Sequence, residues 1–148
     1  MDTTRRQLTK QEMDVVLNRL VALRDKDGSL LIGLADRETV EKSLITMGIE
    51  RKICVCYEAN VFIGILVFDV GYFWWSKELM LSEILVLCVS DTYRGFGRVA
   101  CGLLDSLSKQ YKCKAILAGC IFQQQPKFVQ NTYQKFGYTA YPAFTKLE

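Results

Sequence analysis

The sequence contains no histidine. This absence excludes the Ser-His-Asp and Cys-His catalytic triads and most zinc-ligand sets, and it removes the commonest general base of enzymes. Any catalysis must therefore use carboxylates, tyrosines, backbone amides or water. We also expect no metal site.

Long apolar runs and runs of one charge are missing as well. The apolar stretches are broken by charges such as Asp69, Lys77 and Glu83, so none reaches the roughly 18 residues of a membrane span. Residues 1–10 lack the apolar core of a signal peptide. The 19 basic and 16 acidic residues are scattered, whereas nucleic-acid-binding proteins concentrate their positive charge. We expect a soluble, cytoplasmic protein whose partners include neither a membrane nor a nucleic acid.

Proline is scarce, and the six cysteines form no Cys-x-x-Cys pair. Free cysteine is common in the cores of proteins from reducing compartments, so we expect no disulfide framework. The chain has 148 residues, half of them hydrophobic, which fits one compact domain over residues 1–148.

Apolar residues at helical spacing predict two helices in the first third of the chain. The capping box Thr9-Lys10-Gln11-Glu12 begins the first helix, which ends near Asp27-Gly28. The second helix begins at Asp36 and ends at Gly48.

Three strands are predicted next. Residues Ile53–Tyr57 and Val61–Val70 are rich in β-branched and aromatic side chains and are close enough for a hairpin. A third strand, Glu83–Val89, is apolar on both faces, as in the middle of a sheet. The aromatic run Tyr72–Trp75 lies between the hairpin and this strand. It either walls a substrate site or packs over the core.

The rest of the chain follows the order strand, glycine loop, helix, strand. A helical pattern runs from Val99 to Leu107, and a buried strand follows at Ala115–Ala118. Pro126 opens a last helix that ends near Phe136, and two short closing strands occupy residues 138–147. Together these elements predict an α/β layered domain.

The glycine loop Arg94-Gly95-Phe96-Gly97-Arg98-Val99 leaves the buried strand and enters the helix. Such a turn directs free N–H groups and the positive end of the helix dipole at one spot, where anions bind. Tight turns before helices also need glycine for steric reasons, so the loop alone leaves both interpretations open. The P-loop and the dinucleotide fingerprint do not fit, because their Gly-Lys-Ser/Thr end or three spaced glycines are missing.

A second motif, Tyr133-Gln134-Lys135-Phe136-Gly137-Tyr138, follows in the last helix. The two motifs together resemble the GNAT superfamily of acyl-CoA N-acyltransferases, whose loop reads Gln/Arg-x-x-Gly-x-Gly/Ala and whose later helix ends in Tyr-x-x-x-Gly-Phe. The resemblance implies a mixed, mostly antiparallel central sheet flanked by helices. Two positions depart from the family pattern: Val99 replaces the last glycine or alanine of the loop, and Pro126 replaces an asparagine.

The resemblance also implies roles for single residues. The loop residues Arg94, Gly95, Phe96, Gly97, Arg98 and Val99 would hold the pyrophosphate of acetyl-CoA, and the main chain of Leu87 and Val89 would pair with the pantetheine arm. Glu83 would be the general base, and Tyr133 would protonate the departing thiolate. The structural alternatives are that Glu83 ends its strand in solvent and that Tyr133 is a core aromatic.

The implied function is acetyl-CoA-dependent transfer of an acetyl group to a primary amine of a small molecule or protein, by direct attack in a ternary complex. The alternative is a catalytically inactive GNAT-fold binding or structural protein. A homodimer, common in this fold, is left open.

Overall fold

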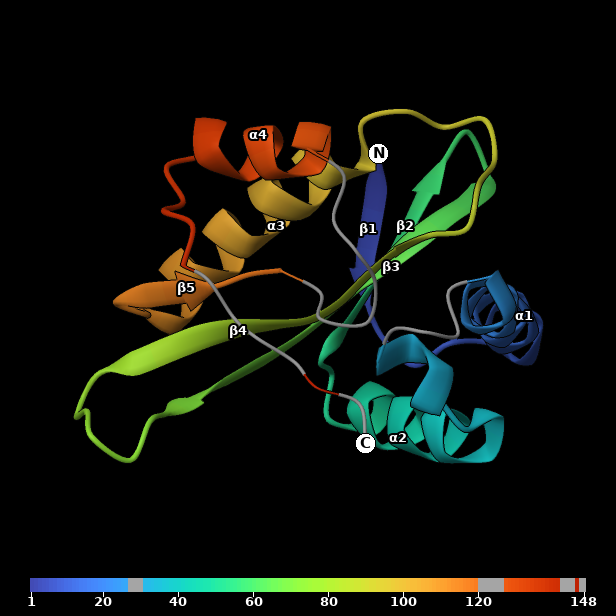
Figure 1. Ribbon diagram of the computed structural model, residues 1–148, viewed down its shortest axis with the longest axis horizontal. Coiled ribbons are helices and arrows are strands. Elements are labelled where there is room, and N and C mark those ends of the chain that lie inside the picture. The colour runs from blue at the N-terminus through green and yellow to red at the C-terminus, as the bar shows by residue number, and fades with distance from the viewer. Residues whose placement is uncertain (27–30, 120–126, 142–145, 147–148) are drawn as a thin grey trace.

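The computed structural model describes residues 1–26, 31–119, 127–141 and 146 (Figure 1). Its elements, in chain order, are β1 (Asp2–Arg5), α1 (Lys10–Lys26), the 3-10 helix η1 (Leu31–Leu34), α2 (Arg37–Ile49), β2 (Ile53–Glu58), β3 (Val61–Tyr72), β4 (Leu79–Cys88), α3 (Phe96–Tyr111), β5 (Ala115–Leu117) and α4 (Lys127–Lys135). No helix within these residues is long and apolar enough to cross a membrane.

The strands form one sheet in the order β1-β2-β3-β4-β5. All neighbours are antiparallel except β4 and β5, which run parallel. The predicted α/β layered fold with a mostly antiparallel sheet is therefore confirmed. The predicted middle strand is the fourth of the five, and β3 occupies the centre.

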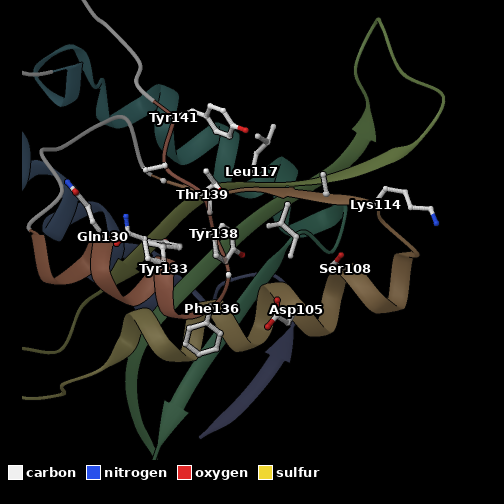
Figure 2. A pocket seen from close by; sticks show the side chains of 17 residues that line it. Asp105, Ser108, Lys114, Leu117, Gln130, Tyr133, Phe136, Tyr138, Thr139 and Tyr141 are labelled. Carbon is white, nitrogen blue, oxygen red and sulfur yellow. The ribbon is translucent and has the colours of Figure 1, made fainter.

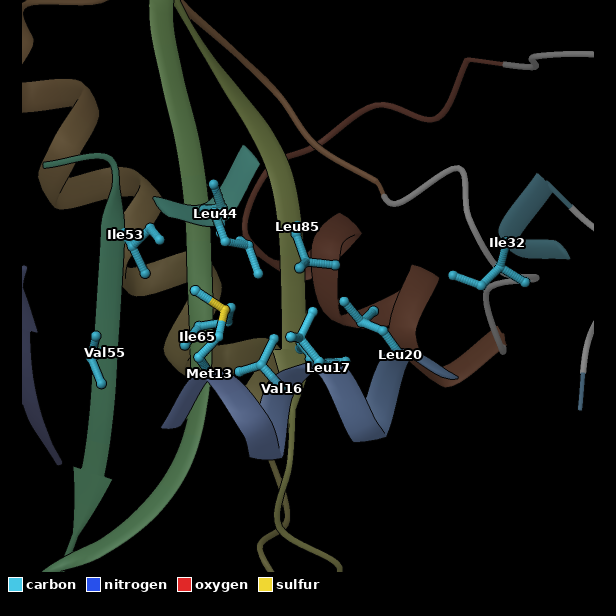
Figure 3. Packing of buried hydrophobic residues seen from close by; sticks show 12 residues of the cluster. Met13, Val16, Leu17, Leu20, Ile32, Leu44, Ile53, Val55, Ile65 and Leu85 are labelled. Carbon is cyan, nitrogen blue, oxygen red and sulfur yellow. The ribbon is translucent and has the colours of Figure 1, made fainter. Parts of the chain in front are cut away.

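Figure 1 shows α1 and α2 on one side of the sheet and α3 and α4 on the other. Met13 and Leu17 of α1 point at the sheet and pack with Leu44 of α2 around Ile65 and Leu85 (Figure 3). On the opposite face a second cluster joins Leu104 and Leu107 of α3 to the sheet residues Leu66, Phe68 and Leu81. The two cores hold the sheet between two helical layers.

The predicted capping box begins α1. The Thr9 hydroxyl accepts from the Glu12 N–H at 3.2 Å, and the Glu12 carboxylate accepts from the Thr9 N–H at 2.8 Å. Glu12 is only 3% exposed, and it also accepts two bonds from the Arg6 guanidinium, at 2.7 and 2.9 Å, and one from the Tyr57 hydroxyl. Burial alone would raise the pKa of Glu12, but these hydrogen bonds outweigh it and lower the pKa to about 2.

The strand β4 differs from its prediction in a way that matters for the site. It begins at Leu79, so Glu83 lies inside the strand and does not begin it. Val67 pairs with Leu85 and Phe68 pairs with Glu83, which leaves Ile84 as an extra residue in a β-bulge. Leu85 and every second residue after it consequently face the side of α1 and α2. Glu83 faces the opposite side, where α3 and α4 lie.

Two further predictions are corrected. The aromatic run Tyr72–Trp75 does not cover the core: it forms the tip of the β3–β4 hairpin, where the Trp74 side chain is 96% exposed. Residues 138–141, where a closing strand was predicted, form no strand. Residues 142–145 and 147 of the predicted closing strands, Pro126, and Asp27-Gly28 lie outside the described residues.

Candidate active site

The N-terminus of α3 presents main-chain N–H groups. Gly95 occupies the N-cap with φ of 86°, in the left-handed region that favours glycine, and within the described chain no side chain caps the helix. The N–H groups of Arg98 and Val99 both donate to the Gly95 carbonyl, at 3.1 and 3.4 Å. The amides of Phe96 and Gly97, in the first turn, have no acceptor inside the helix and are the donors available to an anion.

The Phe96 ring anchors this helix end to the sheet. It is buried and packs with Cys56 and Ile63. Gly64 permits the approach, since a Cβ there would lie 2.9 Å from Phe96 Cζ and 2.3 Å from the Leu87 carbonyl oxygen. The Val99 side chain packs against the same cluster. The β-branched residue at the end of the loop therefore turns into the core and away from the helix end.

Arginines gather around the loop. The Arg94 guanidinium donates to the carbonyls of Asp91 and Tyr93, at 3.0 and 3.3 Å. Arg19 of α1 donates to the Val89 carbonyl at 2.8 Å and to the Asp91 carboxylate at 2.7 Å. Sequence reasoning missed Arg19, because it lies on a helix far from the loop in the chain and no local pattern links the two.

The main chain of Leu87 and Val89 does not face the open edge of β4, which corrects the prediction. The Val89 N–H donates to the Ile63 carbonyl at 2.8 Å, and its carbonyl accepts from Arg19. Because facing directions alternate along an antiparallel pair, the amide of Leu87 also points toward β3. The intervening residues Val86 and Cys88 therefore direct their main-chain groups to the other edge.

That other edge is open beyond the start of β4. The strand β5 pairs only with Met80, Leu81 and Ser82, so β4 and β5 diverge from Glu83 onward. Among the described residues no strand pairs with this stretch of β4 on the side opposite β3. An extended ligand with amide groups could add to it as a further strand does.

Glu83 and Tyr133, the predicted general base and general acid, lie in contact. The Tyr133 hydroxyl donates to Glu83 Oε2 at 2.6 Å. Glu83 is 9% exposed, and its burial raises the pKa of the carboxyl, while the hydrogen bonds from Tyr133 and from the Gly119 amide lower it. Burial, the Glu83 charge and the shared hydrogen bond raise the pKa of Tyr133. Glu83 does not end its strand in solvent.

Two buried polar atoms of the described chain lack a hydrogen-bond partner: Glu83 Oε1 and the Tyr138 hydroxyl. The Tyr133 and Tyr138 rings meet edge to face with centroids 5.3 Å apart. The Tyr138 hydroxyl is the group that a phenylalanine at this position of the family motif would lack. Unpartnered buried oxygens of this kind are where a water or a polar ligand group binds.

A cavity of about 1000 Å³ adjoins these tyrosines (Figure 2). Tyr133 and Tyr138 line it together with Asp105 and Ser108 of α3 and Leu117 of β5. Its walls thus combine aromatic rings with a carboxylate and a hydroxyl, as sites for small organic ligands do.

Other candidate groups add no chemistry here. Burial, and then the charges of Glu83 and Asp105, raise the pKa of Cys101 to about 11, so its thiol stays protonated at neutral pH. The Asp25 carboxylate, at the end of α1, accepts from the neighbouring Arg24 at 3.4 Å. Over the described ranges no group of three or more Cys, Asp or Glu side chains could hold a metal ion.

No protein-family model and no curated protein matches the sequence. Among solved structures, the chain is similar to a probable acetyltransferase, at 15% identity with a TM-score of 0.66, over 100% of this chain and 96% of the other. A predicted acetyltransferase from Clostridium acetobutylicum, solved with acetyl-CoA, is 16% identical with a TM-score of 0.62, over 99% and 96%. A GNAT family acetyltransferase from Staphylococcus aureus is 17% identical with a TM-score of 0.58, over the whole of both chains. The chain therefore has the fold of the GNAT superfamily of acetyltransferases.

Proposed function

We propose that this protein is an acetyl-CoA-dependent N-acetyltransferase that acts on a primary amine of a small molecule or a protein, in a ternary complex. The observation that carries the proposal is the 2.6 Å hydrogen bond between Tyr133 and Glu83. It brings a buried base and a partly buried acid together beside the divergence of β4 and β5, which an ordinary core has no need to do.

The residues fit acetyl-CoA in two places. The N-terminus of α3, with the free amides of Phe96 and Gly97 and the nearby side chains of Arg94 and Arg98, suits a pyrophosphate. The open edge of β4, at Val86 and Cys88, suits the amides of a pantetheine arm. We therefore keep the loop residues in the proposal and move the strand contacts by one residue, from Leu87 and Val89 to their neighbours.

Acetyl-CoA supplies a thioester acyl group, and the chain must move one proton from the amine to the departing thiolate. Glu83 Oε1 has no partner in the described structure and would accept the amine proton, directly or through a water that Tyr138 also holds. The raised pKa of Glu83 makes it a stronger base than an exposed carboxylate.

Tyr133 would complete the transfer. Its phenol is protonated at neutral pH, and because burial and the Glu83 charge raise its pKa, it would release that proton only as Glu83 supplies another. Because its hydroxyl already donates to Glu83, the proton that Glu83 gains can replace the one that Tyr133 loses. The pair would thus act as a two-residue relay that ends each cycle in its starting state.

The test is a calorimetric titration of acetyl-CoA into the protein and into Gly97→Glu, with Gly97→Gln as the uncharged control of similar size. A side chain fits at this position, because a Cβ on Gly97 would meet only Thr132 Cγ2, at 3.8 Å. A carboxylate at a helix N-terminus stabilises the helix, so lost binding would not reflect unfolding.

We expect micromolar binding by the wild type and by Gly97→Gln, and a loss of at least about tenfold in Gly97→Glu from the repelled pyrophosphate. Binding that survives unchanged in Gly97→Glu would remove the loop from the proposal. If the wild type binds no acetyl-CoA, the proposal that the protein is an acetyltransferase is wrong, and a catalytically inactive protein with the GNAT fold is favoured.

A further inference from the structure

The β3–β4 hairpin carries an aromatic tip that extends beyond the body of the protein. The strand β2 begins at Ile53, opposite Val67, and β5 pairs with β4 only over Met80–Ser82. The residues between Tyr72 and Leu79 therefore project past both neighbouring strands, as Figure 1 shows at its lower left.

The tip exposes three large aromatic side chains to water. Trp74 is 96% exposed, and Tyr72 and Trp75 are 64% and 63% exposed. No charge interrupts the sequence from Val70 to Ser76. Single exposed apolar side chains are common, but a set of neighbouring exposed aromatic residues marks an interaction site.

The tip is held in a defined shape. The Ser76 N–H donates to the Phe73 carbonyl at 3.0 Å, and the Ser76 hydroxyl accepts from the Glu78 N–H at 3.0 Å. The Phe73 and Trp75 rings lie 5.7 Å apart. A rigid aromatic surface loses little conformational freedom when it binds, which favours association.

Basic side chains surround the base of the hairpin. Lys114 precedes β5, and its N–H donates to the Leu79 carbonyl at 2.8 Å, so it lies beside the hairpin (Figure 2). Lys109 and Lys112, at the end of α3, and Lys77, in the hairpin loop, are also exposed. Among the acids at this end, Glu50 and Asp69 are ion-paired to Lys52, and the exposed Glu78 offsets the charge of the adjacent Lys77, so the positive charge comes from Lys109, Lys112 and Lys114. An aromatic tip within a basic surround matches the interface of an anionic lipid bilayer, where Trp and Tyr rings lie at the headgroups and Lys side chains meet the lipid charge.

We infer that the Tyr72–Lys77 tip is a docking surface for an anionic membrane, into which Trp74 and Trp75 insert at the level of the headgroups. No spanning segment is needed, so the absence of one in the sequence does not oppose this binding. A second copy of the chain would cover the aromatic rings as well, but it carries the same basic surround, and two such tips would repel each other. The inference does not depend on acetyltransferase activity.

The chain offers a direct readout, because its two tryptophans are both in the tip. Tryptophan emission is recorded while the full chain is titrated with phosphatidylcholine vesicles, with and without phosphatidylserine. We expect a shift to shorter wavelength and quenching by brominated lipid, both only with phosphatidylserine present. Added salt should weaken the effect, because it screens the attraction between lysines and lipid.

Variants separate the rings from the charge. In vesicle co-sedimentation, the double variant Trp74→Ala/Trp75→Ala should lower vesicle affinity at least about tenfold. The double variant Lys112→Glu/Lys114→Glu should lower it about fivefold or more for each lysine replaced. The matched control is Leu34→Ala, which removes an apolar side chain that is 74% exposed elsewhere and should bind as the wild type does. Thermal unfolding should be unchanged in all of them, since every altered side chain is exposed.

Three results would each overturn the inference. One is the absence of a tryptophan shift with any vesicle. Another is binding that the tryptophan substitutions leave intact, which would assign it to charge alone. The third is a shift that grows with protein concentration in the absence of lipid, which would show that the tip packs against another copy of the chain.

Discussion

Tyr133 Oη and Glu83 Oε2, from residues fifty positions apart in the chain, lie 2.6 Å from each other between α4 and the fourth strand of the sheet. Glu83 is buried and Tyr133 is partly buried. Each one changes the proton affinity of the other, so a substitution at either position should be visible at its partner.

Glu83→Gln should lower kcat at least about 100-fold, because the amide cannot accept a proton from the acceptor amine.

The same substitution, Glu83→Gln, should not lower the free energy of unfolding at pH 7. Burial raises the pKa of Glu83 in the folded protein. The protonated carboxyl therefore contributes stability that is fully present below its ordinary pKa and is lost as pH rises through the raised pKa. The stability advantage of Glu83→Gln should therefore be larger at pH 7 than at pH 4. Urea unfolding at both pH values, with steady-state rates, checks this; an unchanged kcat would reject Glu83 as the base.

Tyr133→Phe should shift the acidic limb of the kcat profile to higher pH. The Tyr133 hydroxyl lowers the pKa of Glu83 against the effect of burial, so without it the carboxyl holds its proton more tightly. A kcat profile from pH 4 to 9 for the wild type and the variant would measure the shift. If the rate falls but the limb stays in place, the hydrogen bond does not control the base.

Tyr138→Phe tests whether the Tyr138 hydroxyl takes part in catalysis or whether the side chain serves only in packing. A buried hydroxyl without a partner costs about 1–3 kcal/mol, so its removal should leave the melting temperature unchanged or raised. If the hydroxyl holds a water for Glu83, kcat should nevertheless fall about tenfold, with little change in the KM for acetyl-CoA. An unaltered kcat would assign Tyr138 to packing alone.

Glu12 should control the acid stability of the fold. Its pKa is lowered to about 2, so it adds stability that is complete above its ordinary pKa of 4.5 and is lost as pH falls toward 2. Glu12→Gln should lower the free energy of unfolding by about 2–3 kcal/mol at pH 7 and by much less near pH 2. Urea unfolding at several pH values measures the difference, and a gap that does not narrow in acid would place the effect in packing instead of charge.

The sequence predicted the elements whose patterns are local. The capping box located the start of α1, Asp36 located the N-cap of α2, and β-branched runs located β2 and β3. The N-cap side chain of Asp36 accepts from the Thr39 N–H at 2.9 Å, as its position suggested. In each case one short stretch of chain contains both the signal and the interaction that satisfies it.

Features that depend on a distant partner were not predictable in this way. The strand β1 has the polar sequence Asp-Thr-Thr-Arg and is defined only by its pairing with β2. The exposed Trp74 carries the same apolar signal as a core residue, and only the length of the hairpin removes it from the core. Among the described residues the Tyr138 hydroxyl has no partner, and this likewise depends on distant residues, because Tyr133, Asp105 and Glu83 lie around it.

The single extra residue at Ile84 makes the length of β4 part of the site. If one residue were removed between Glu83 and Leu85, every later side chain of the strand would change face, and either the carboxylate or the apolar residues would enter the wrong layer. A related chain could change its loops freely and keep this arrangement, but it could not lose that one position. Residue 84 can therefore be substituted by other amino acids, but it cannot be deleted without disrupting the site.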